Sequence, residues 1–116
     1  MPKKLLIPLL DDDVAPRFDL ATDVMLIRLG RNSEAEERII VLPQASADDL
    51  CALATSEKSD TVICGGIDEE HFQYLKWKGI HVFDDVIGPV TMVLESYKSG
   101  QLTPGMNFHT GFNLAS

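Results

Sequence analysis

The sequence has few residues of several kinds, and each scarcity excludes a class of protein. Only two of its 116 residues are cysteines, Cys51 and Cys64, which is too few for a disulfide-stapled secreted scaffold. The longest apolar run, residues 5–10, is far shorter than the roughly 20 residues of a membrane-spanning helix. It is also too short for a secretory signal, so we expect a cytoplasmic protein with reduced thiols.

Basic residues are also scarce. The chain has 10 Lys and Arg against 18 Asp and Glu, a formal net charge of −8 at pH 7. Phosphate groups are bound by local Lys and Arg, so this balance argues against nucleic acid and against an anionic membrane as partners. The hydrophobic fraction of 45% is that of an ordinary globular protein. We expect one domain over residues 1–102, followed by a tail over 103–116.

Hydrophobic periodicity predicts an α/β fold. Apolar runs bounded by Gly, Pro or polar clusters predict five strands, at 4–10, 23–29, 37–42, 60–64 and 80–83. Capping signals and helical spacing predict helices at 47–57 and 69–78, and a last helix between Pro89 and Gly100. Helical crossovers join parallel strands, so this βββαβαβα order predicts a five-stranded mixed sheet in the order 3-2-1-4-5 with flanking helices. That is the ribonuclease H-like layout.

The topology predicts where a ligand would bind. In open α/β sheets the site lies beyond the carboxyl ends of strands, at the switch point of the strand order. Here that point lies between the first and fourth strands, so the loop 11–22 should meet Cys64, Gly65 and Gly66. A cysteine close to a helix N-terminus can be a reactive thiolate, and glycine N–H groups can bind an anion. The alternative is a buried cysteine followed by a tight turn.

Two short motifs in this order and spacing resemble a known family. The first is Ile7-Pro8, then Asp12 or Asp13, then the run Val14 to Ala21 (VAPRFDLA); the second is Val62 to Ile67 (VICGGI). They resemble the opening and the second motif of the dinitrogenase iron-molybdenum cofactor biosynthesis family, and the likeness extends over residues 4–102. The resemblance implies a ribonuclease H-like fold and non-covalent binding of a metal–sulfur cluster.

The resemblance also implies a set of site residues. Cofactor-binding residues would be Arg17, Phe18, Gly65 and Gly66, and Cys64 would be the metal ligand. The sequence departs from the family pattern at Ala15, where serine is usual, and at Asp19, where glycine is usual. Arg17 stands where some members have a histidine. Arg17 could therefore hold an anionic cluster by charge and hydrogen bonds, or it could be a solvated surface residue.

Other residues have weaker claims to a role. His71, near the predicted site, and His109, in the tail, are the second choices as metal ligands. The acidic run 11–13 could bind a hard cation, but such a run is more often a solvated surface. Cys51 is expected to be a packing residue of its helix.

These observations leave three functions open. The first is a non-catalytic carrier that binds an iron-molybdenum cofactor, its precursor, or another molybdenum, iron or copper sulfide cluster, and passes it to a partner protein. The second is a cluster-free regulatory or interaction module on the same fold. The third, a two-metal nuclease, is disfavoured because the first strand has no internal Asp or Glu and the fourth ends in Cys64. We therefore expect a protein that is not an enzyme.

Overall fold

The computed structural model describes residues 3–30 and 35–108, and within them it places six strands, three α-helices and one short 3-10 helix. In chain order these elements are β1 (Lys3–Leu10), β2 (Asp13–Val14), the 3-10 helix η1 (Phe18–Leu20), β3 (Asp23–Leu29), β4 (Ala35–Val41), α1 (Ala47–Ser56), β5 (Thr61–Ile63), α2 (Glu69–Trp77), β6 (His81–Phe83) and α3 (Val90–Lys98). This arrangement confirms the predicted α/β class.

The strands form one open, mixed sheet. Along its main path the order is β4-β3-β1-β5-β6. β1 pairs antiparallel with β3 and parallel with β5, where Leu6 lies opposite Val62. β5 continues in parallel to β6. The helices α1 and α2 connect these strands as the crossovers that parallel pairing requires.

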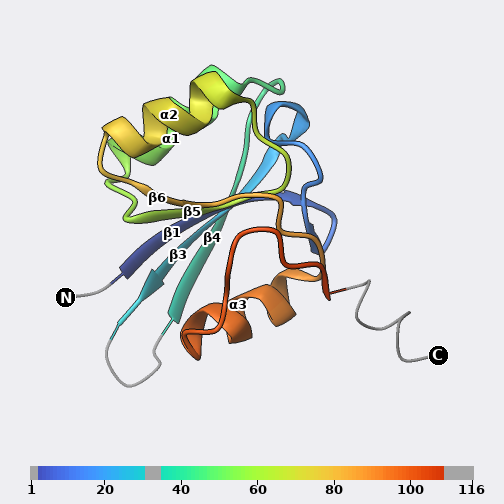
Figure 1. Cartoon of the computed structure of the whole chain (residues 1–116). Helices are drawn as coiled ribbons and strands as arrows, with labels where there is room; N and C mark the ends of the chain where they lie inside the picture. Colours follow the sequence, from blue (N-terminus) through green and yellow to red (C-terminus); the bar gives the residue numbers. More distant parts are fainter. Residues whose placement is uncertain (1–2, 31–34, 109–116) are drawn as a thin grey trace.

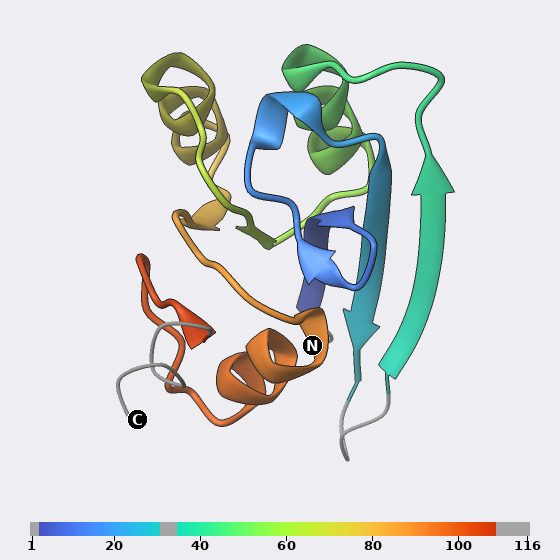
Figure 2. The ribbon, with the colours of Figure 1, turned by 90° about the vertical axis from the view of Figure 1, so that its right-hand side faces the viewer.

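The predicted strand count was wrong, and the predicted order was therefore incomplete. A sixth strand, β2, pairs antiparallel with the end of β1, where Leu9 lies opposite Val14. Asp11 turns the chain between the two strands with a φ of 56°. The sequence predicts a loop in this segment, because two residues are too few to show strand periodicity. Figure 2 shows β2 as a small arrow beside this turn.

Helices cover both faces of the sheet, so the core has two halves. α1 and α2 lie on one face and α3 lies on the other (Figure 1). Alternate residues of a strand point to opposite faces. Leu6 of β1 accordingly packs in the half beneath α1 and α2, whereas Leu5 and Ile7 pack in the half beneath α3. β1 is the central strand and contributes to both halves.

Two exposed apolar features lie away from the core. β4 forms one edge of the sheet (Figure 2). Its residues Ile39 and Val41 are 53% and 67% exposed. Near the end of α2, Trp77 is 77% exposed, and the ammonium of Lys78 lies 4.9 Å from its ring centroid.

No helix within the described ranges is both long and apolar enough to cross a membrane.

Part of the predicted tail packs on the domain. The N–H of Ile87 donates to the carbonyl of Met106, and the N–H of Phe108 donates to the carbonyl of Ile87, both at 2.9 Å. Met106 and Phe108 also pack against the core beneath α3. The rest of the predicted tail, including His109, lies outside the described residues.

Candidate functional site

The two segments that topology predicted to meet lie side by side. They are the loop after β2, which contains Pro16 and Arg17, and the loop after β5. The N–H of Gly66 donates to the carbonyl of Pro16 at 2.7 Å, and the N–H of Phe18 donates to the carbonyl of Gly66 at 2.8 Å. Arg17 and Gly66 thereby form a parallel bridge outside the named strands. The first and fourth predicted strands therefore do bring these segments together at the carboxyl end of the sheet.

Gly65 is required by the closeness of this approach. A Cβ atom at Gly65 would lie 2.4 Å from the carbonyl oxygen of Ala15 and 2.5 Å from that of Pro16. Both are backbone atoms that cannot rotate away. At Gly66 the nearest such atom is 3.4 Å away, so a methyl group fits there far more easily. The N–H of Gly66 is already donated to Pro16, so it would have to leave this bond to bind an anion. The cofactor-binding role of Gly65 and Gly66 stays a prediction.

Arg17 is exposed at the surface of the loop, but its charge is paired. Its Nε lies 3.1 Å from Asp19 Oδ1 and its Nη2 lies 2.7 Å from Asp19 Oδ2, a two-point contact. The Arg17 side chain is 64% exposed and that of Asp19 is 40% exposed. Exposed ion pairs contribute about 1 kcal/mol or less, so this pair can open for a stronger anion.

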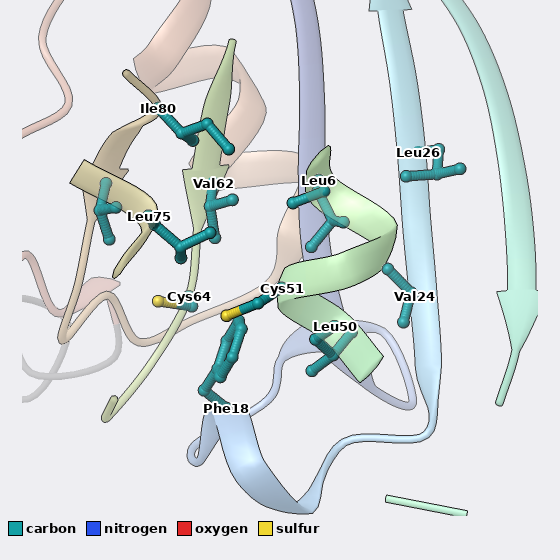
Figure 3. Packing of buried hydrophobic residues seen from close by; sticks show 12 residues of the cluster. Leu6, Phe18, Val24, Leu26, Leu50, Cys51, Val62, Cys64, Leu75 and Ile80 are labelled. Atoms are coloured by element: carbon teal, nitrogen blue, oxygen red, sulfur yellow. The ribbon is translucent and has the colours of Figure 1, made fainter. Parts of the chain in front are cut away.

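Phe18 is not on the surface of the site. It is buried in the core half beneath α1 and α2, where it packs with Leu50, Cys51 and Cys64 (Figure 3). Its ring anchors the loop from below, and the neighbouring Arg17 is thereby held at the surface. A cofactor-binding role for Phe18 stays a prediction, and it would require the buried ring to leave the core.

Cys64 is also fully buried in the same core half. Burial raises the pKa of its thiol well above the ordinary value, and the carboxylates of Asp84 and Asp85 raise it further. Of the two alternatives for Cys64, the structure therefore has the buried cysteine and not a thiolate stabilised by a helix dipole. The physical reason is the separation of Cys64 from α2 along the chain. The N-cap of α2 is Asp68, and the dipole of a helix acts mainly on groups near its first turn. Metal ligation by Cys64 stays a prediction, and it would require the thiol to leave the core.

His71 joins α1 to α2. Its Nδ1 lies 2.7 and 2.8 Å from the two carboxylate oxygens of Asp68, and its Nε2 lies 2.8 Å from Asp48 Oδ1. The hydrogen bond with Asp48, followed by that with Asp68, raises the pKa of His71 above its ordinary 6.5, although partial burial opposes this. In the part of the chain described, no group of three or more His, Cys, Asp or Glu is arranged to hold a metal ion.

Two hollows that the sequence does not predict flank Pro16. The smaller, of about 230 Å³, is lined by Leu10, Pro16, Ile87 and the carboxylate-bearing residues Asp13 and Asp85, among others. The larger, of about 300 Å³, shares Leu10 and Pro16 and extends to Arg17 and Leu20. The acidic run 11–13 was the one visible signal of this surface. The apolar part was invisible because Leu10 and Ile87 lie far apart in the sequence.

Comparison with known proteins tests the fold. No protein-family model matches the chain, and no curated protein matches it. A protein from Methanocaldococcus jannaschii, provisionally named a dinitrogenase, superposes with a TM-score of 0.73 at 18% identity, over 92% of this chain and 98% of that one. The chain has the fold of this protein.

Two further solved structures have the same fold. A Thermotoga protein provisionally named NifB superposes with a TM-score of 0.66 at 18% identity, over 91% of this chain and 96% of that one. The apo form of the orange protein from Desulfovibrio gigas gives a TM-score of 0.69 at 20% identity, over 90% and 94%. At these identities the likeness establishes a shared fold along nearly the whole length, and it does not by itself transfer a function.

Proposed function

We propose that this protein is a non-catalytic accessory protein of metal–sulfur cluster metabolism, which binds or carries an anionic cluster and passes it to a partner protein. The observation that carries the proposal is the shared fold with proteins named after dinitrogenase and NifB, together with the two motifs at the meeting of the loops. Membership of the iron-molybdenum cofactor biosynthesis family and the ribonuclease H-like classification belong to this proposal.

In this proposal the cluster is cargo, an iron-molybdenum type or another molybdenum, iron or copper sulfide cluster. Arg17 would turn from Asp19 to the cluster and supply charge and hydrogen bonds. Gly65 would keep the two loops close enough to form one surface. The thiolate of Cys64 would suit a thiophilic metal if the loop moved to expose it. Because Cys51 and Cys64 are free thiols, a reducing compartment such as the cytoplasm fits this role.

The test is cluster retention under anaerobic conditions. Protein purified without oxygen would be offered iron, molybdate or copper with sulfide and passed through gel filtration, and its metal content and visible absorption measured. We expect a coloured species that is retained by the wild type and by the control variant Arg28→Ala, and that is weakened in Arg17→Ala. A colourless, metal-free protein under every condition would refute the carrier proposal.

A second candidate, a cluster-free interaction module, is favoured by a specific observation. Arg17 is paired with Asp19, the N–H of Gly66 is donated to Pro16, and Cys64 is buried, so the groups proposed to hold the cluster are engaged. Asp19→Gly, which restores the residue usual in the family, discriminates the two candidates. It frees Arg17, so a carrier should gain cluster retention, whereas an interaction module should stay metal-free.

A further inference from the structure

The rim of the loop site carries an apolar surface. Leu10, Leu20 and Ile87 are 57%, 61% and 44% exposed. They come from the end of β1, from η1 and from the segment before α3, and they surround the two hollows beside Pro16. A single exposed apolar side chain is ordinary on a soluble protein, but a contiguous set around concave surface is typical of a binding site.

The backbone beneath this surface is held in place. The N–H of Ala15 donates to the carbonyl of Pro8 at 2.9 Å, and the N–H of Val14 donates to the carbonyl of Gly88 at 3.0 Å. Together with the bonds between Pro16 and Gly66, these fix both walls of the smaller hollow. A preformed surface loses little conformational entropy when a partner binds, so the hollows are suited to docking.

Carboxylates border the apolar surface on the side of the smaller hollow. Asp13 and Asp85 line the smaller hollow, and Asp11 and Asp12 follow Leu10 directly in the chain. Among residues 3–30 and 35–108, the one basic residue that lines either hollow is Arg17, which is held by Asp19. Interfaces commonly have an apolar centre and a polar rim, and complementary charge selects the partner. A partner segment that complements this surface would be apolar and basic.

We propose that this surface docks a basic, apolar segment of a partner protein, with aliphatic side chains in the two hollows and Lys or Arg side chains facing Asp13 and Asp85. The proposal rests on the proposed function, since it names the kind of protein that would deliver or receive the cluster. A second copy of this chain does not fit, because it would bring one acidic rim against another. An acidic rim also repels an anionic cluster, and a basic partner would offset that repulsion.

The first test uses peptide probes. A fluorescein-labelled peptide of alternating Leu and Lys would be titrated with the full chain at physiological salt, and its anisotropy measured. Two comparison peptides would carry Ser in place of Leu, or Glu in place of Lys. We expect the Leu/Lys peptide to bind at least about tenfold more tightly than either comparison peptide, equivalent to about 1.4 kcal/mol. Equal binding of the Leu/Lys and Ser/Lys peptides would overturn the proposal, because it would mean attraction by net charge alone.

The second test locates the surface. Leu10→Ser and Ile87→Ser keep the net charge and change exposed side chains, and each should weaken Leu/Lys peptide binding about tenfold, as interface centres do. Asp85→Asn should weaken binding and reduce its dependence on salt. The matched control is Ile39→Ser on β4, which is similarly exposed but distant in the sheet, and it should bind as the wild type does. An equal loss in Ile39→Ser would refute the location.

The same variants separate this proposal from the proposed function. Leu10→Ser and Ile87→Ser should weaken peptide binding and leave cluster retention as in the wild type. Peptide binding without any cluster retention would sustain the docking surface and reject the carrier role. Cluster retention without peptide binding would support the carrier role and refute the docking surface.

Discussion

Gly65 is the residue that allows two distant loops to touch. Any side chain there meets the carbonyl oxygens of Ala15 and Pro16. The Pro16 carbonyl accepts from the N–H of Gly66, and the N–H of Ala15 donates to the carbonyl of Pro8, so this backbone is held in place. We therefore expect Gly65→Ala to lower the free energy of unfolding by about 1–3 kcal/mol, the usual cost of inserting a methyl group into a packed position. Urea unfolding followed by far-UV circular dichroism measures this change.

The matched control is the next residue. Gly66→Ala adds the same methyl group where the nearest atom is 3.4 Å away, so its cost should be a small fraction of that at Gly65. If the two variants were equally destabilised, the loss would reflect glycine flexibility in general and not the close approach of the loops.

The two cysteines should differ in reactivity. Burial, then Asp48 and Asp68, raises the pKa of Cys51 to about 11, yet Cys51 lines a hollow of about 290 Å³ between α1 and α2. Cys64 has no such opening in the structure described and is fully buried. Since the thiolate is the reacting form, native protein should react slowly with Ellman's reagent, and Cys51 should react before Cys64.

Single variants assign the phases of this reaction. Cys51→Ser should remove the faster phase and Cys64→Ser the slower one, and both phases should merge when the protein is unfolded in urea. A fast native phase that survives in Cys51→Ser would mean that Cys64 reaches solvent. That result would favour its proposed role as a metal ligand.

At the scale of elements, His71 couples α1 to α2 through a charge. A neutral imidazole has one N–H and can donate to only one of the two carboxylates, whereas the protonated ring donates to both Asp48 and Asp68. The pKa of His71 is raised in the folded protein, so its stabilising contribution is fully present below pH 6.5 and is lost as the pH rises through the raised value. The wild type should therefore lose stability relative to His71→Gln as the pH rises above 6.5.

Urea midpoints at pH 5.5 and at pH 8.5 check this linkage. The size of the change should be modest, since the Asp48 side chain is 89% exposed and solvent screens the pair. His81→Gln is the control for general histidine titration. A pH dependence that is identical in the wild type and in His71→Gln would reject the coupling.

At the scale of the whole molecule, a charged residue on the edge strand β4 opposes self-association of the sheet. Glu37 shares a face of β4 with the exposed Ile39 and Val41. Charged residues on edge strands oppose pairing with another chain. We expect Glu37→Ile to create an apolar row on this edge and to cause concentration-dependent self-association, which sedimentation velocity measures. Glu37→Gln removes only the charge and should associate less, so equal association would mean that the charge alone is responsible.

The sequence predicted the long elements well, because each has its own local signals. Ser46 and Asp68 cap α1 and α2 through their side chains, and Gly79 ends the turn after α2 with a positive φ. β2 was missed because a strand of two residues depends on its partner β1 rather than on its own pattern. Local sequence signals therefore predict the elements whose structure depends mainly on their own residues.

The candidate site was predicted less completely. Topology predicted that the loop containing Arg17 would meet Gly65 and Gly66, and the hydrogen bonds between them bear this out. The burial of Cys64 and the pairing of Arg17 with Asp19 depend on side-chain packing, which spacing along the chain does not reveal. The hollow between Leu10 and Ile87 likewise exists only after folding.

The chain has one tryptophan, and its position has a spectroscopic consequence. The indole of Trp77 is already in water in the folded protein and lies beside the ammonium of Lys78. Its emission should therefore be that of a hydrated indole before and after unfolding, and soluble quenchers should reach it in both states. Tryptophan fluorescence is consequently a poor monitor of folding here, but it is a local probe of anything that covers the end of α2.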